Sequence, residues 1–186
     1  MKFDDLLKWS IIIITLVYVS ACSLIKNKTE HRDFYHLQAL PNSLQNKTFL
    51  EILTFEQEQK QTLVTQIETT QQTLILGAMT LSGLPIVQAK WHNNQGLIDF
   101  ESTTFDEDMV IRIIRDIQLI KWPEQIITLG LIPGYEVLTT TKSLTSSVRT
   151  IVNDDKEIIK ITYSGDKIKL INTEDHYQLI IEQINE

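Results

Sequence analysis

Alternation between side-chain types is clearest in residues 63–69, Leu63-Val64-Thr65-Gln66-Ile67-Glu68-Thr69. Successive side chains of a β-strand point to opposite faces of a sheet, so this period of two predicts a strand with one buried face. Other stretches of strand length are rich in Leu, Ile, Val, Thr and Phe. The predicted strands are 48–56, 61–70, 72–81, 85–92, 96–102, 136–140, 148–153, 157–163, 167–172 and 177–183.

Turn-forming residues separate several of these strands. Ser82-Gly83-Leu84-Pro85 and Asn93-Asn94-Gln95-Gly96 supply residues that tolerate positive φ or fix a bend. Ser164-Gly165-Asp166 predicts the clearest hairpin of the chain. The short spacing indicates strands that meander antiparallel to one another.

A helical pattern interrupts the strands between Asp106 and Ile120. Its apolar positions recur at helical spacing and are Met109, Val110, Ile113, Ile114, Ile117 and Ile120. Asp106 and Glu107 suit the N-terminal end of a helix dipole, and Thr103 or Thr104 is the expected cap. Pro123 should end this helix, and a second short helix is expected over 124–129, terminated by Pro133-Gly134.

These elements predict a mainly β, α+β fold: a curled antiparallel sheet or incomplete β-barrel of about ten strands around one central amphipathic helix. Such a sheet must hide its edges and its apolar face. Incomplete curling would leave an apolar cavity, whereas complete packing would leave a filled core, and composition does not separate the two. The residues predicted to line a cavity are Leu63, Ile67, Leu74, Leu76, Met109, Ile113 and Ile117.

The N-terminus has the layout of a secretory signal, with an apolar run that closes on small residues. Val19-Ser20-Ala21-Cys22 resembles the bacterial lipobox, which implies cleavage after residue 21 and lipidation of Cys22. An uncleaved membrane anchor is the alternative. Ser23, where sorting to the inner membrane uses aspartate, implies the periplasmic face of the outer membrane. The predicted organisation is a signal peptide over 1–21, a lipidated tether over 22–47 with one short helix near 34–40, and a single β-rich domain over 48–186.

Composition and motifs argue against several functional classes. The net charge of −7, from 17 basic and 24 acidic residues, disfavours nucleic-acid binding. Cys22 is the only cysteine, and no metal-binding, phosphate-binding or nucleophile motif occurs, so neither a cofactor nor catalysis is expected. The acidic run Asp106 to Asp108 is best explained as a first helical turn. The four histidines are expected to lie on the surface and are His31, His36, His92 and His176.

Three parts of the chain carry a family resemblance: residues 116–123, Arg149 before a strand, and Ile171-Asn172 followed by 177–181. They resemble an uncharacterised family of bacterial outer-membrane lipoproteins that are often encoded in aryl-polyene biosynthesis clusters. More distantly, the order of strands, helix, proline-ended connection and further strands is similar to the lipoprotein carrier LolA and the receptor LolB. That resemblance implies an incomplete barrel with helices over an acyl-binding cavity.

The sequence therefore predicts an outer-membrane lipoprotein that binds or positions a lipophilic molecule: an acyl chain, a lipoprotein or an aryl-polyene lipid. A periplasmic carrier or a biosynthetic complex is the protein partner that this role implies. The resemblance to LolB also implies that Leu84, in a turn, contacts the membrane. The alternative is a non-catalytic periplasmic scaffold that docks on an enzyme or export complex through its sheet edge or an exposed aromatic such as Trp91. A hydrolase is the third candidate.

Overall fold

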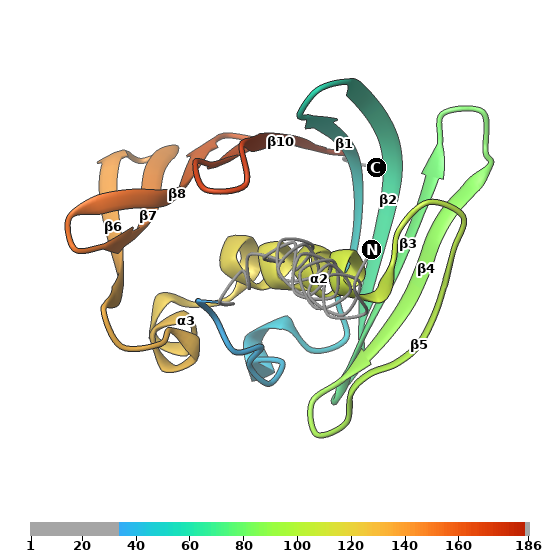
Figure 1. Ribbon diagram of the computed structural model, residues 1–186, viewed down its shortest axis with the longest axis horizontal. Coiled ribbons are helices and arrows are strands. Elements are labelled where there is room, and N and C mark those ends of the chain that lie inside the picture. The colour runs from blue at the N-terminus through green and yellow to red at the C-terminus, as the bar shows by residue number, and fades with distance from the viewer. Residues whose placement is uncertain (1–33, 185–186) are drawn as a thin grey trace, which may run out of the picture. The chain divides into compact units, whose positions relative to one another are not determined.

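The computed structural model describes residues 34–184 and contains a single ten-stranded antiparallel sheet in the order β5-β4-β3-β2-β1-β10-β9-β8-β7-β6 (Figure 1). The strands are β1 (Thr48–Glu56), β2 (Lys60–Thr69), β3 (Thr73–Thr80), β4 (Pro85–His92), β5 (Gly96–Ser102), β6 (Tyr135–Ser143), β7 (Ser146–Asn153), β8 (Lys156–Ser164), β9 (Lys167–Asn172) and β10 (Tyr177–Gln183). The helices of the described part are α2 (Glu107–Lys121) and α3 (Glu124–Gly130), with one 3-10 turn, η2 (Asn42–Leu44). The prediction of a mainly β fold with about ten antiparallel strands is confirmed.

The sheet curls but does not close. β1 pairs with β2 on one side and with β10 on the other, which joins the strands before the helices to those that follow them. Each half is otherwise a chain of hairpins, so β5 and β6 remain as the two edges. In Figure 1 the sheet bends around α2, which lies on its concave side with α3 beside it.

The concave face of the sheet and α2 form the core. Alternate residues of β2, β3 and β4 are buried, as the period of two requires. Trp91 shows the pattern well, because it follows buried Val87 and Ala89 at two-residue steps and is only 2% exposed. The expectation that Trp91 is an exposed docking residue is therefore wrong. Neither helix of the described part is long and apolar enough to cross a membrane.

The helix boundaries differ slightly from the prediction. Asp106, not Thr103 or Thr104, caps α2: its side chain accepts a hydrogen bond from the Met109 backbone N–H at 2.9 Å. The helix begins at Glu107, which leaves both threonines too far upstream to reach its free N–H groups. α3 ends at Gly130, before Pro133-Gly134, which instead forms the turn into β6.

Residues 34–40 form no helix. They run extended across the helices: Tyr35 forms an isolated antiparallel bridge with Leu131, and Phe34, Tyr35 and Leu40 are buried in the core. The compact unit accordingly starts at Phe34, so part of the segment expected to be a tether packs with the β-rich domain. The signal peptide, Cys22, Ser23, His31 and the rest of the tether lie outside the described residues.

Candidate functional site

Five of the seven predicted cavity residues lie in the hydrophobic core between the sheet and α2. Strand β2 contributes Leu63 and Ile67, and β3 contributes Leu74 and Leu76; all four are almost completely buried and belong to the hydrophobic core. Ile117 joins the same core from α2. The sequence therefore identified residues that share one apolar interior, although each is also an ordinary core residue.

Helix α2 divides into two halves. Toward its N-terminus, Met109 and Ile113 are partly exposed, and Ile113 packs against the edge of the core. From Ile114 to Ile120 every residue is buried, including polar ones. The hydrophobic surface of α2 that solvent can reach is thus on its N-terminal half.

A buried polar cluster fixes the middle of α2 to the β9–β10 turn. Arg115 Nε donates to Asp116 at 3.2 Å, and its Nη2 lies 3.3 Å from the Tyr177 hydroxyl and 3.7 Å from the Asp175 carboxylate. The Tyr177 hydroxyl also donates to Asp116. Burial raises the pKa of the Asp116 carboxyl, and burial together with the Asp116 charge raises the pKa of Tyr177. The cluster satisfies these groups internally and thereby holds the helix in place.

Two further side chains, Lys121 and Gln118, hold the same half of α2. Lys121 Nζ lies 2.6 Å from the Glu51 carboxylate of β1, with both side chains buried. Gln118 accepts hydrogen bonds from the Tyr35 hydroxyl at 3.1 Å and from the Gln38 N–H at 2.8 Å, and it donates to the Gln38 carbonyl at 3.1 Å. The segment before β1 is therefore fastened to the helix by a side chain that a helical pattern alone would assign to solvent.

The C-terminal end of α2 is held by β7 and β8. Arg149 Nη1 donates to the carbonyls of Leu119 at 2.6 Å and Trp122 at 3.0 Å, and the Tyr163 hydroxyl donates to the Ile120 carbonyl at 2.7 Å. The last carbonyls of a helix have no partner within it, and a positive charge there is favourable. Arg149 Nε is buried without a hydrogen-bond partner in the described part of the chain.

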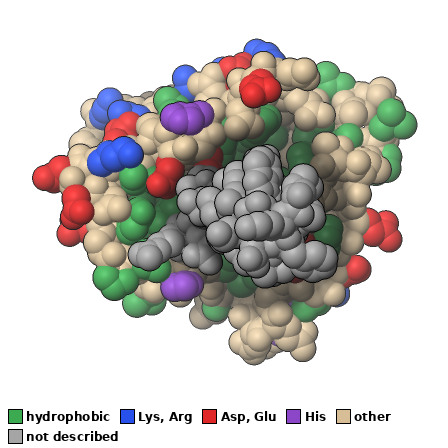
Figure 2. All heavy atoms as spheres, viewed as in Figure 1, with side chains coloured by type: hydrophobic (Ala, Val, Ile, Leu, Met, Phe, Trp, Pro, Cys, Tyr) green, Lys and Arg blue, Asp and Glu red, His purple; other side chains and the backbone are tan. Residues whose placement is uncertain are grey.

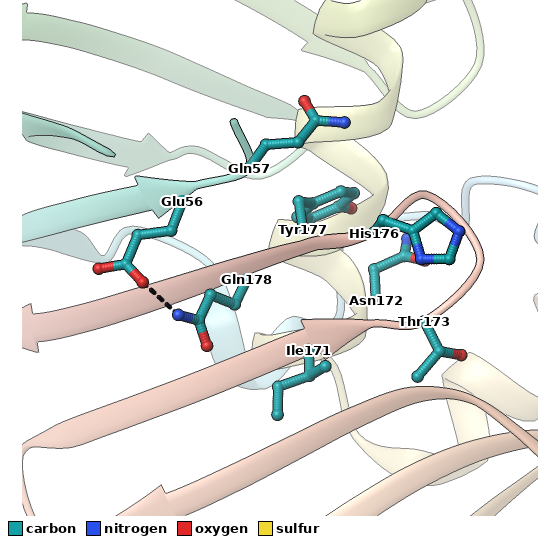
Figure 3. Close-up of a pocket in the computed structure, with 8 residues that line it drawn as sticks. All are labelled: Glu56, Gln57, Ile171, Asn172, Thr173, His176, Tyr177 and Gln178. Atoms are coloured by element: carbon teal, nitrogen blue, oxygen red, sulfur yellow. Dashed lines mark hydrogen bonds between the residues drawn. The ribbon is translucent and has the colours of Figure 1, made fainter. Parts of the chain in front are cut away.

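A pocket of about 450 Å³ lies at the rim of the sheet, where β1 ends and β9 turns into β10 (Figure 3). In Figure 3, Glu56 and Gln178 lie side by side on one flank and His176 lies on the other. Glu56 accepts a hydrogen bond from Gln178 and pairs with Lys60 at 3.0 Å; mainly the Lys60 contact lowers the pKa of Glu56. The lining is mixed, so the pocket suits a polar group better than an acyl chain.

The turn between β3 and β4 exposes a small apolar surface. Leu84 is 64% exposed, and the neighbouring Leu81 and Met79 are 67% and 40% exposed. In Figure 2, hydrophobic side chains gather at the upper right edge, where Figure 1 places this turn. Sequence reasoning identified Leu84 but missed Leu81, which occupies the same turn.

The remaining candidate groups do not assemble into a site. The described residues contain no group of three or more His, Cys, Asp or Glu side chains placed to hold a metal ion. His36 and His176 are exposed and His92 is partly exposed. Asp106 to Asp108 form the cap and first turn of α2, as expected for that acidic run.

One family model matches most of the β-rich domain. The model of the family described as "Protein of unknown function (DUF3261)" matches residues 50–185, from the third residue of β1 to just past the end of β10. No functionally curated protein matches the chain. The match spans nearly the whole curled sheet and both helices, and the chain accordingly belongs to the DUF3261 family.

Proposed function

We propose that the chain is an outer-membrane lipoprotein, anchored through an acylated Cys22 and facing the periplasm, whose domain binds or positions a lipophilic molecule during envelope assembly. The candidate ligands are an acyl chain, a lipoprotein acyl group or an aryl-polyene lipid. The lipobox-like Val19-Ser20-Ala21-Cys22 and the following Ser23 support the anchor and its location. The role includes no catalytic step and no cofactor.

The observation that carries the binding role is the uneven anchoring of α2. The polar contacts that tie this helix to the sheet and to residues 35–38 begin at Arg115 and end at Trp122. Its N-terminal half packs on the core through Val110, makes no such polar contact in the described part of the chain, and leaves Met109 and Ile113 partly exposed. A helix fixed at one end can move aside at the other and admit a lipophilic chain.

In this arrangement the ligand lies along the apolar interior formed by β2 and β3. The chain would contact Leu63, Ile67, Leu74, Leu76 and Ile117, with Met109 and Ile113 at the entrance. Each buried methylene contributes roughly 0.8 kcal/mol, so an acyl chain of ordinary length can offset the free energy of moving half a helix. The resemblance to LolA and LolB, which rests on the order of the elements along the chain, implies an unclosed sheet with helices over it, and we extend that resemblance to the ligand.

Leu84 orients the domain toward the bilayer in this proposal. One buried leucine contributes about 1.5 to 3 kcal/mol, which is small beside two or three acyl chains but sufficient to bias orientation. The exposure of Leu81 beside it doubles the apolar surface that this turn can insert. The turn would act as a guide for ligand transfer, while the lipid anchor holds the protein.

Binding can be tested on residues 34–186, the compact unit of the chain. An environment-sensitive fatty-acid probe should bind the folded domain and be displaced by unlabelled lipid. Ile113→Asp should abolish binding, because it places a charge at the entrance. Ile98→Asp is the matched control, since Ile98 is 41% exposed and packs outside the core cluster. Failure of the folded wild-type domain to bind any lipophilic probe would contradict the proposal.

The anchor has a separate test. Cys22→Ala should abolish acylation, detected by mass spectrometry of the intact protein, and should move the protein out of the outer-membrane fraction. Unchanged fractionation of the Cys22→Ala protein would mean that the N-terminal segment is an uncleaved membrane anchor.

The scaffold alternative has one observation in its favour: within residues 34–184, the edge strands β5 and β6 each pair on one side only. Trp91 cannot serve as a docking residue of such a scaffold, because its side chain is buried. A domain that binds no lipophilic probe but copurifies with one periplasmic enzyme or export complex would favour the scaffold.

A further inference from the structure

Strand β6 presents a free edge. It is the last strand of the sheet and pairs with β7 on one side, and no strand within residues 34–184 pairs with its other side. Such an edge exposes a row of backbone N–H and C=O groups that can pair with another strand. β6 spans nine residues, which is long for an unprotected edge.

The two edges of the sheet differ in the sign of their charges. β5 carries Asp99 and Glu101, both exposed and both negative, so they would repel each other across a pair of β5 strands. β6 carries one exposed charge of each sign, Glu136 and Lys142, and opposite charges attract across a strand pair. The central run of β6, residues 138–141, is Leu-Thr-Thr-Thr: it has no charge, no glycine and no proline, and threonine is favoured in strands. β6 is thus the edge that remains open to pairing.

The β6–β7 hairpin also projects beyond the core. Every residue from Leu138 to Thr145 is exposed, and Leu138 is 51% exposed although it lies within a strand. At the hairpin tip Leu144 is fully exposed. A second chain can therefore approach the β6 edge along its whole length, and its binding would cover the exposed leucine side chains.

The sequence of β6 matches itself in the antiparallel direction. In an antiparallel pair, two directly opposite residues either both point their backbone N–H and C=O groups at the partner strand or both point them away. Two copies of β6 therefore pair only in registers centred on a residue. Centring on Thr139 places Glu136 of each copy opposite Lys142 of the other, and Leu138 opposite Thr140. A shift by one such step places Glu136 opposite Thr140 or Leu144 instead. Only the register centred on Thr139 pairs the two charges, and the two-fold axis makes that pair twice.

We propose that two copies of this chain form a two-fold dimer through antiparallel pairing of their β6 strands, with Thr139 at the axis. The register of β6 with β7 shifts between Thr141 and Ser143, so Lys142 lies where the regular strand ends. Its four-carbon side chain reaches across to Glu136 from there. Both charged residues are exposed in the single chain, so either can be changed without disturbing the core.

The test is a charge-reversal cycle on the full chain in detergent, followed by sedimentation equilibrium. The wild type should dimerise reversibly. Glu136→Lys and Lys142→Glu should each weaken dimerisation about tenfold or more, because each variant turns two attractive cross-strand pairs into two repulsive ones. The double variant Glu136→Lys/Lys142→Glu should restore dimerisation to near the wild-type level.

The control is Thr128→Lys, which adds a positive charge at an exposed position of α3 and should leave the dimer unchanged. Thr139→Lys adds the same charge at the axis, where two lysines would face each other, and should abolish the dimer. Circular dichroism of each variant checks that it folds. A monomeric wild type, or a dimer that none of the β6 variants weakens, would overturn the proposal.

Discussion

Arg149→Met tests whether the hydrogen bonds of Arg149 at the C-terminal end of α2, called the Arg149 clamp below, hold the helix against the sheet. Arg149 makes two hydrogen bonds of good length, to the Leu119 carbonyl at 2.6 Å and to the Trp122 carbonyl at 3.0 Å. Hydrogen bonds to a charged group contribute about 1.5 to 3 kcal/mol each, so their loss costs about 3 to 6 kcal/mol. Methionine also removes the buried, unpartnered Nε, which returns part of that free energy. We therefore expect a loss near the lower value, about 3 kcal/mol.

Urea unfolding of residues 34–186, followed by tryptophan fluorescence, measures this loss, since Trp122 lies directly at the clamp. Arg112→Met is the control, because Arg112 is partly exposed on the other half of the same helix, and it should cost no more than about 0.5 kcal/mol. Arg149→Lys should fall between the two variants. Equal stability of Arg149→Met and Arg112→Met would refute the idea that the C-terminal half of α2 is the fixed half.

Three other predictions test separate parts of the structure. Gly130→Ala should destabilise the domain by about 1 to 3 kcal/mol, because a Cβ there would lie 2.4 Å from the Tyr35 ring and 2.6 Å from the His36 carbonyl oxygen. Gly77→Ala is the control and should not destabilise the domain, because a Cβ at residue 77 meets nothing within 4 Å. Equal denaturation midpoints for the two variants would contradict this packing. Leu84→Glu should leave folding and location intact, because Leu84 is 64% exposed, but should slow the transfer of bound lipophile to liposomes. Equal transfer rates for mutant and wild type would remove Leu84 from the mechanism. Burial raises the folded-state pKa of Asp116 above its ordinary 3.8, so the wild type should lose stability as pH rises from 3.8 through that raised value. Asp116→Asn has no carboxyl at this position and should not show this loss. Parallel curves of stability against pH for the two proteins would contradict this assignment.

The strands and α2 were predictable because their apolar residues follow the two simple periods. The alternation in residues 63–69 and the spacing of Val110, Ile114 and Ile117 each depend only on which face is buried. The same rule explains why the Trp91 prediction was wrong. Applied to Val87, Ala89 and Trp91, alternation places the tryptophan on the concave face, and that burial outweighs the general tendency of a large aromatic to mark a docking surface.

The polar contacts of α2 could not be predicted in the same way. A helical pattern assigns Arg115, Asp116 and Gln118 to solvent, because it assumes one buried face. In the structure, sheet, residues 34–40 and the β9–β10 turn surround this half of the helix, so these residues are buried and find partners far away in the chain. Their partners Tyr177 and Tyr35 lie more than 60 residues from them, a separation that no local pattern encodes.

Residues 34–40 were misjudged for a related reason. Their composition is mixed, which suggested a tether, but Phe34 stacks on Tyr135 with ring centroids 5.3 Å apart, and the Tyr35 ring lies against Gly130. Both contacts depend on the turn that follows α3, which is distant in sequence. By contrast, the exposure of Leu84 followed from its position in a turn alone.

Mass spectrometry of organic extracts tests the central claim most directly. Wild-type, Ile113→Asp and Ile98→Asp proteins would each be purified from membranes. The measured quantity is the number of non-covalently bound lipophilic molecules recovered per protein chain, which leaves out the acyl chains attached covalently at the N-terminus. A lipophile recovered near one per chain from the wild type and from Ile98→Asp, but depleted from Ile113→Asp, is the predicted result. The same low background in all three correctly folded proteins would contradict the proposal that the domain holds a lipophilic ligand beneath the N-terminal half of α2.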